Sequence, residues 1–246
     1  MDALKFTLSG KTAFFKKPDV NSYFYFTYGS IHKIALLGIL GAIMGYGGYN
    51  QQSREENQQS YPEFYQRLKD IRLGISPKNQ RGHIPKKIQT FNNSVGYANK
   101  DGNLIVKEQW LENPCWDIYI LIQGSMEREI AENIFNARAV YLPYLGKNDH
   151  FADITETSLL KDIEPLDQPQ SINSLFIKDY FQIEVQDRPK RGQREPIFKY
   201  EEKLPVSLEA ATNLYRFSTF IYTNSQLATL EKASIYRCNE QNIFFF

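Results

Sequence analysis

Three histidines, His32, His83 and His150, are the side chains of this 246-residue chain that ordinarily titrate nearest to neutral pH. A metal-independent ribonuclease needs such groups, because one must take the proton of the 2′-hydroxyl and another must protonate the leaving oxygen. His32 stands beside Lys33 and His83 just before a pair of lysines, whereas His150 falls in an acidic segment that would repel a phosphate. His32 and His83 are candidates for acid–base chemistry, but we expect both to be RNA contacts or surface residues.

Other catalytic and metal-binding patterns are absent from the sequence. It has no H-E-x-x-H or G-x-S-x-G segment and no carboxylate cluster with metal-ligand spacing. Its two cysteines, Cys115 and Cys238, lie far apart and form no C-x-x-C pair, which favours reduced cytosolic thiols over a disulfide framework or a zinc site. We therefore expect a cytoplasmic protein with no metal and no cofactor.

Two glycine-containing segments have a superficial likeness to nucleotide-binding loops. "SGKT" at positions 9–12 has Lys5 where a P-loop requires glycine. "GYGGYN" at positions 45–50 lacks the last glycine of G-x-G-x-x-G, and no strand pattern runs directly into it. Neither segment indicates a nucleotide cofactor.

Lysines and aromatic residues are interleaved near the N-terminus, as in proteins that bind single-stranded nucleic acid. Lys11, Lys16 and Lys17 accompany seven aromatic residues between positions 14 and 28. Lysines contact phosphates, and aromatic rings stack on unpaired bases. Positions 71–100 contain six basic residues and no acidic one, and 188–194 form a third basic segment. Since the net charge is only +1, affinity for RNA must come from such local patches.

The glycine-rich segment at positions 30–50 predicts a helix. Its apolar core, positions 34–45, is well short of the roughly 20 residues that span a bilayer, so we expect no membrane segment. Ser30 is a plausible N-cap. Gly38, Gly41 and Gly45 fall on one helical face, which indicates close approach of a backbone or a ligand. Packing on a sheet is the expected cause.

The hydrophobic pattern predicts an α+β fold of ferredoxin-like, RRM-like βαββαβ type, with hairpin and helix insertions and a β-rich C-terminal extension. We expect a ferredoxin-like RNA-binding domain at 1–150 and the extension at 151–246. Positions 148–167 hold six acidic residues and one lysine and are expected to be a surface excursion. The predicted elements are a strand at 3–10, a helix at 61–75, a hairpin at 87–111 with its turn at Asp101-Gly102, a central strand at 116–124, a helix at 125–140 and a strand at 140–146.

Three segments resemble one protein family. They are "FFKKPDVNSYFYFTYGSIHKIALLGILGAIMGYGGY" from position 14, "LENPCWDIYILIQG" from position 111 and "YLPYLGKNDHFADI" from position 141. They are similar to the CRISPR-associated Cas-five family, part of the repeat-associated RNA-binding (RAMP) proteins, and most like its subtype I-B branch. The resemblance covers roughly residues 3 to 155.

This resemblance implies a subunit that binds the 5′ handle of a CRISPR RNA (crRNA) in a type I Cascade surveillance complex for antiviral defence. Its partners would be the Cas-seven backbone, the Cas-eight large subunit and, through the complex, target DNA. One branch of the family cuts the repeat with a Tyr, Lys and His set. Tyr46 and Tyr49 could supply the tyrosine, but no Lys-His pair stands in the central strands, so we expect no catalysis and a separate Cas-six nuclease.

The residue pattern and the resemblance together nominate a set of RNA contacts, including a phosphate site at the basic N-terminal end of the glycine-rich helix. The set is Lys11, Lys16, Lys17, Asn21, Tyr23, Tyr28, Ser30, His32, Lys33, Tyr46, Arg81, Lys86, Lys87, Lys190 and Arg191. Two other functions stay open: an endoribonuclease for CRISPR repeat RNA, and a protein-interaction scaffold whose aromatic residues are merely core.

Overall fold

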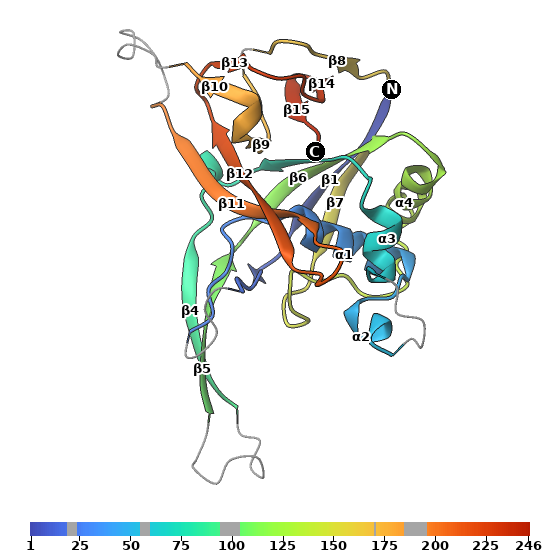
Figure 1. Cartoon of the computed structure of the whole chain (residues 1–246), viewed down its shortest axis with the longest axis vertical. Helices are drawn as coiled ribbons and strands as arrows, with labels where there is room; N and C mark the ends of the chain where they lie inside the picture. Colours follow the sequence, from blue (N-terminus) through green and yellow to red (C-terminus); the bar gives the residue numbers. More distant parts are fainter. Residues whose placement is uncertain (19–23, 55–59, 94–103, 170, 185–195) are drawn as a thin grey trace.

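The computed structural model describes residues 1–18, 24–54, 60–93, 104–169, 171–184 and 196–246. This part of the chain has an α+β fold with several antiparallel sheets and few helices (Figure 1). The α+β class predicted from the sequence is confirmed. No helix among the described residues is long and apolar enough to cross a membrane.

The central sheet is fully antiparallel, in the order β3-β6-β1-β7. Its strands are β1 (Asp2–Ser9), β3 (Leu73–Pro77), β6 (Cys115–Ile122) and β7 (Asp153–Leu160). Helix α1 (Lys33–Met44) lies between β1 and β3 along the chain, and α4 (Ser125–Phe135) lies between β6 and β7. The expected central strand, β6, is indeed flanked on both sides and buried along its length.

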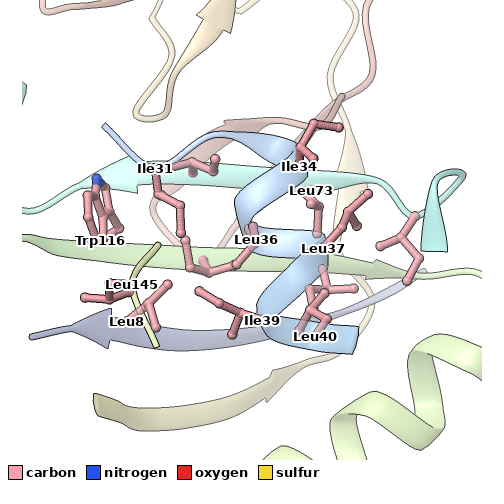
Figure 2. Packing of buried hydrophobic residues seen from close by; sticks show 14 of the residues in the cluster. Leu8, Ile31, Ile34, Leu36, Leu37, Ile39, Leu40, Leu73, Trp116 and Leu145 are labelled. Carbon is pink, nitrogen blue, oxygen red and sulfur yellow. The ribbon is translucent and has the colours of Figure 1, made fainter. Parts of the chain in front are cut away.

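Apolar side chains that alternate along the strands form the core against α1. Figure 2 shows Leu8, Leu73 and Trp116 on the strands facing Leu36 and Leu40 of the helix. Because successive strand residues point to opposite faces, one face of each strand is committed to this core. Leu204, Leu208 and Phe220 from the C-terminal part join the same cluster.

Two of the four strands of this sheet, β3 and β7, lie where the sequence pattern predicted no strand. The helix predicted at 61–75 is only α3 (Glu63–Leu68), and β3 begins at Leu73. Residues 140–146 form no strand, because the backbone N–H groups of Val140 and Tyr141 donate to the carbonyls at the end of α1 instead. The fourth strand is β7, within the segment expected to be a surface excursion. The domain boundary at residue 150 stays a prediction. The central sheet contains strands from both sides of that position.

Helix α1 begins and packs differently from expectation. Its N-cap is His32, not Ser30, and it ends at Gly45, whose φ of 80° is left-handed. Gly41 faces α3, where an added Cβ would lie 2.6 Å from the Cβ of Phe64. No described atom lies within 4 Å of a Cβ placed at Gly38. The glycines therefore do not bring the helix against the sheet, and close approach occurs at α3.

The hairpin predicted at 87–111 forms a long arm that projects from the body (Figure 1). Strands β4 (Lys86–Asn93) and β5 (Leu104–Glu112) pair antiparallel, and the short β2 (Thr12–Ala13) pairs with the base of β5. The turn at Asp101-Gly102 lies outside the described residues. We call β4 and β5 the arm.

The C-terminal part is β-rich, as expected, and consists of small antiparallel sheets. Strand β11 pairs with β12 along its length, and β12 also pairs with β9. The strands of this part are β8 (Glu164–Pro165), β9 (Phe176–Ile177), β10 (Phe181–Ile183), β11 (Lys199–Leu208), β12 (Tyr215–Thr223), β13 (Leu227–Thr229), β14 (Ile235–Cys238) and β15 (Gln241–Phe244). The remaining short helices are α2 (Tyr49–Gln52), η1 (Gln80–Gly82) and η2 (Lys178–Tyr180).

Candidate nucleic-acid interface

The lysine- and aromatic-rich segment folds back on itself as a two-stranded ribbon, which we define as residues 14–18 and 24–28. The N–H of Lys17 donates to the carbonyl of Phe26 at 2.8 Å, and the N–H of Tyr28 donates to the carbonyl of Phe15 at 2.9 Å. Phe15 and Tyr28 anchor the ribbon in the core, whereas Lys16 is exposed. Asn21 and Tyr23 lie outside the described residues.

The ribbon lies along the arm. The N–H of Tyr25 donates to the carbonyl of Lys107 at 2.8 Å, and the N–H of Gln109 donates back to the carbonyl of Tyr25 at 2.9 Å. The ammonium of Lys16 stands 4.1 Å from the centre of the Tyr25 ring, a cation–π contact. The neighbouring ring of Phe26 is 39% exposed. Because Tyr25 pairs in parallel with Glu108, its ring and Lys16 lie on the Glu108 face of β5, opposite the side chain of Lys107.

The opposite face of the arm carries a second set of cationic and apolar side chains. Lys86, Ile88 and Thr90 alternate on β4, so they share a face, and Lys107 stands opposite Thr90 on β5. Ile88 and Ile105 are 64% and 57% exposed on the same face. Lysines beside exposed apolar side chains can meet both the phosphates and the bases of a single strand.

Lys87 points to the other face of the arm. Its ammonium lies 3.5 Å from the carboxylate of Glu112 and 5.9 Å from the centre of the Trp110 ring. Lys11 is exposed just before β2. The two lysines thus lie near the base of the arm, separate from the face that carries Lys86. Lys190 and Arg191 lie outside the described residues.

Three nominated contacts lie in the core and cannot touch RNA: Tyr28, Ser30 and His32. The hydroxyl of Ser30 accepts the indole N–H of Trp116 at 3.1 Å. The Nδ1 of His32 accepts the N–H of Ala35 at 3.3 Å and caps α1, while its ring packs edge-on against Tyr28. Burial therefore excludes all three from the predicted RNA contacts, and the polar atoms of Ser30 and His32 satisfy buried partners instead.

Burial also removes His32 as an acid–base candidate. It lowers the pKa of His32 to about 3, so the imidazole is neutral at physiological pH. His150 is buried as well, with Nδ1 2.6 Å from the hydroxyl of Thr12 and its ring edge-on to Trp110. His150 is therefore inaccessible because it is buried, and not because acidic residues lie near it in the sequence. Of the three histidines, His83 alone is exposed.

The phosphate site expected at the N-terminus of α1 is also absent. The ammonium of Lys33 donates to the carbonyl of Phe246 at 3.0 Å, and burial lowers its pKa to about 8. Tyr46 follows the opposite end of the helix, where its hydroxyl donates to the sulfur of Met126 and its ring faces the guanidinium of Arg67. Lys33 and Tyr46 are therefore structural residues at the two ends of α1.

A cavity of about 460 Å³ opens where the ribbon, the start of β4 and β11 meet. Lys17 and Lys86, both predicted to contact RNA, line the cavity, and Arg81 lies in η1, two residues before the lining residue His83. No local sequence pattern indicates the contribution from β11, because the mixed charges at the start of that strand resemble those of any solvated edge. The lining residues are Lys17, Gly29, His83, Ile84, Lys86, Tyr200, Glu201, Glu202 and Lys203.

The face of the central sheet opposite α1 carries ion pairs rather than stacking platforms. The hydroxyl of Thr7 lies 2.7 Å from the carboxylate of Asp117 and 2.8 Å from that of Glu156. Lys5 and Lys78 neutralise these carboxylates at 3.1 and 3.0 Å. At the other end of this face, C-terminal apolar residues pack on β1 and β6. The described residues of this face therefore offer no exposed aromatic ring for the base stacking that an RRM uses.

No group of three or more His, Cys, Asp or Glu side chains in the described part of the chain could hold a metal ion. Cys115 and Cys238 are free thiols, and burial raises the pKa of both. The candidate interface thus consists of cations and aromatic rings, which can bind a polyanion.

Comparison with known proteins identifies the fold. No protein-family model and no curated protein sequence match the chain. Its structure is similar to a chain of a solved "CRISPR RNA-guided surveillance complex", with 12% identity, a TM-score of 0.51, and coverage of 93% of this chain and 91% of that chain. The chain shares its fold with CRISPR proteins. A CRISPR protein from Archaeoglobus fulgidus aligns over 99% of this chain and 98% of its own, with 9% identity and a TM-score of 0.53.

Proposed function

We propose that this chain is a non-catalytic RNA-binding subunit of a type I CRISPR Cascade complex, a member of the Cas-five family closest to subtype I-B. It holds the 5′ handle of the crRNA and bridges a Cas-seven backbone to a Cas-eight large subunit, through which the complex meets target DNA. The order β3-β6-β1-β7, with α1 and α4 as the connections, supports the ferredoxin-like part of this proposal.

The observation that carries the proposal is the set of exposed cations and apolar side chains on the ribbon and arm. Lys86 and Lys107 share one face of the arm with the exposed Ile88 and Ile105, and Lys16 lies over Tyr25 at the other face. This surface occurs in a fold shared with a chain of a CRISPR RNA-guided surveillance complex. A scaffold with merely structural aromatics explains Phe15, which is buried, but not the exposed Phe26 beside a lysine.

The absence of catalysis in this proposal rests on the histidines. His32 and His150 are buried, and the imidazole of His32 serves as a helix cap. A general base must reach the proton that it abstracts, either directly or through one water. Neither group can reach a bound ribose without unfolding its surroundings.

One observation favours endoribonuclease activity as a second candidate. His83 and Lys86 line the same cavity, beside the phenol of Tyr200. These are the residue types of a metal-independent cut: an imidazole for proton transfer and an ammonium for the developing charge. The phenol is committed to Glu202, and burial raises its pKa further, which makes it a poor proton donor.

Sequencing the RNA that co-purifies with the protein and its neighbouring subunits distinguishes these functions. We expect RNAs that share one short 5′ repeat tag, and no specific cut when the purified chain alone is incubated with repeat RNA. A specific cut that is lost in His83→Ala, with RNA affinity retained, would establish the nuclease instead. Recovery of no RNA would favour the scaffold.

A further inference from the structure

The ribbon and the arm together form one layer of paired chain. The two segments of the ribbon pair with each other through a bridge between Lys16 and Thr27. The segment that contains Tyr25 also pairs in parallel with β5 at Glu108, and β5 pairs with β4 along its length. Successive side chains of an extended chain point to opposite faces of such a layer. The face to which each side chain points therefore follows from these pairings.

Phe24 and Phe26 lie on the face that carries the exposed apolar residues of the arm. Both flank Tyr25, whose ring lies on the Glu108 face, so they point to the face of Lys107. Their rings are adjacent, with centres 4.6 Å apart and planes tilted by 49°. We call this face the platform, and its residues used below are Phe24, Phe26, Lys86, Ile88, Lys107 and Gln109.

The platform carries free positive charge. Lys86 and Lys107 are exposed, and neither takes part in an ion pair of the described residues. The acidic residues of β5, Glu108 and Glu112, point to the other face. Unpaired ammonium groups beside apolar rings match a single strand of nucleic acid, which presents phosphates and flat bases together. They favour such a polyanion over an apolar protein surface as the occupant of the platform.

Gln109 is the polar group next to Phe26. It stands one residue beyond the Tyr25–Glu108 pair, as Phe26 does, so the two side chains are neighbours at the strand spacing of about 5 Å. Among the described residues, the side-chain amide of Gln109 makes no hydrogen bond. An amide offers both a donor and an acceptor, and proteins use such groups to bind the edges of unpaired RNA bases. Gln109 is therefore placed to select the base that lies on the neighbouring ring.

We propose that the platform stacks one base of the bound RNA on Phe26 and hydrogen-bonds the edge of that base through Gln109. Sheets that bind single-stranded RNA stack bases on exposed aromatic side chains in the same way. This inference rests on the proposed function, and it deepens that function by assigning base stacking and base selection to two named residues.

The test combines RNA that lacks single bases with variants of the platform. The probe is a labelled synthetic copy of the RNA that co-purifies with the protein, in which one nucleotide at a time is abasic. Stacking of a base on an aromatic ring is worth about 5- to 150-fold in affinity. We expect loss of one particular base to weaken binding to the wild-type protein by this amount. Phe26→Ala should weaken binding of the intact RNA equally and should be insensitive to that position.

Three further variants separate stacking from selection and from folding. Gln109→Ala should remain sensitive to loss of that base but should lose the preference among the four bases there. Phe26→Leu keeps apolar volume against Phe24 and offers no aromatic face, so it should match Phe26→Ala and replaces it if the alanine variant unfolds. Phe135→Ala removes an exposed ring on α4 and should bind every probe as the wild type does.

Other outcomes overturn the inference in distinguishable ways. If the Phe26 variants weaken binding independently of every abasic position, no base stacks on Phe26. Unchanged affinity in these variants removes the platform from the interface. In both cases, RNA bound by the wild-type protein leaves the proposed function standing. A base preference that persists in Gln109→Ala refutes selection by its amide. Failure to recover any RNA with the wild-type protein overturns both the inference and the proposed function.

Discussion

The fate of single side chains in this protein is set by burial. The imidazole of His32 has the ideal position in the chain for a phosphate contact, at the start of a helix and beside a lysine. It instead points inward, caps α1 and packs against Tyr28 and Tyr215. The neighbouring Lys33 points to a carbonyl. Lys16, Lys86 and Lys107, by contrast, are exposed, and the proposed RNA surface depends on them.

Because His32 is buried, we expect the free energy of unfolding to decrease at acid pH. The pKa of its imidazole is about 3 in the folded state and near 6.5 when unfolded, so the unfolded state binds the proton more tightly. Stability is unaffected above pH 6.5 and falls as the pH drops toward 3, by about 1.4 kcal/mol per pH unit. Urea unfolding at pH 7, 6 and 5 measures this slope.

The variant His32→Asn isolates this effect, because asparagine keeps a capping oxygen and does not titrate. We expect the acid-induced loss of stability to be smaller in His32→Asn than in the wild type. His83→Asn, at an exposed position, should retain the wild-type slope. Equal slopes in all three proteins would show that His32 is accessible to protons in the folded state.

Substitution of Lys16 is the most direct test of RNA binding by the ribbon. Its ammonium is exposed over Tyr25 and makes none of the ion pairs of the described residues, whereas Lys17 is held by Glu202. Lys16→Ala should lower the salt slope of RNA binding by about 0.7, the value for one phosphate contact. Fluorescence anisotropy at several salt concentrations measures it. An unchanged slope would remove the ribbon from the binding surface.

Elements with strong local patterns could be predicted from the sequence, and the others could not. The alternation in β1, the apolar run of β6 and the acidic first turn of α4 each identify their element. Strand β3 is five residues long, buried on both faces and contains Gly74 and Pro77, so its pattern merges with that of the preceding helix. Strand β7 lies at a sheet edge, where polar side chains are tolerated, and therefore resembles a loop.

Local sequence patterns likewise predicted only part of the candidate site. Lys16, Lys17 and Lys86 were predicted from local charge, and the structure brings Lys17 and Lys86 to one cavity. Glu202 and Lys203 stand more than a hundred residues farther along the chain, so only the tertiary fold reveals them. Ser30 and His32 were misassigned because a sequence shows the polarity of a residue but not the direction in which it points.

Helix α1 offers a matched pair of substitutions. Gly38→Ala should stabilise the protein by up to about 1 kcal/mol, because alanine has the higher helix propensity and no described atom occupies the space. Gly41→Ala should destabilise it by about 1–3 kcal/mol, because the new methyl group meets Phe64 of α3. Chemical denaturation of both variants checks this. Equal stabilisation by the two substitutions would contradict the packing of α1 against α3.

The described part of the molecule combines a body with a projecting arm (Figure 1). The ribbon is anchored in the core by Phe15 and runs along β5, and Gly29, next to its anchored end, is joined to β11 by Glu202. The C-terminal part therefore contributes both to the core and to the candidate interface. RNA bound along the ribbon would contact segments from both sides of residue 150, and the opposite sheet face would remain free of it.

Ultraviolet crosslinking of the RNA-bound protein, followed by mass spectrometry of the crosslinked peptides, locates the RNA on the chain. We expect crosslinks in the ribbon and on the Lys86 and Lys107 face of the arm. Crosslinks to the face of β1 and β6 opposite α1, or to the start of α1 near Lys33, with none in the ribbon, would refute RNA binding by the ribbon and arm.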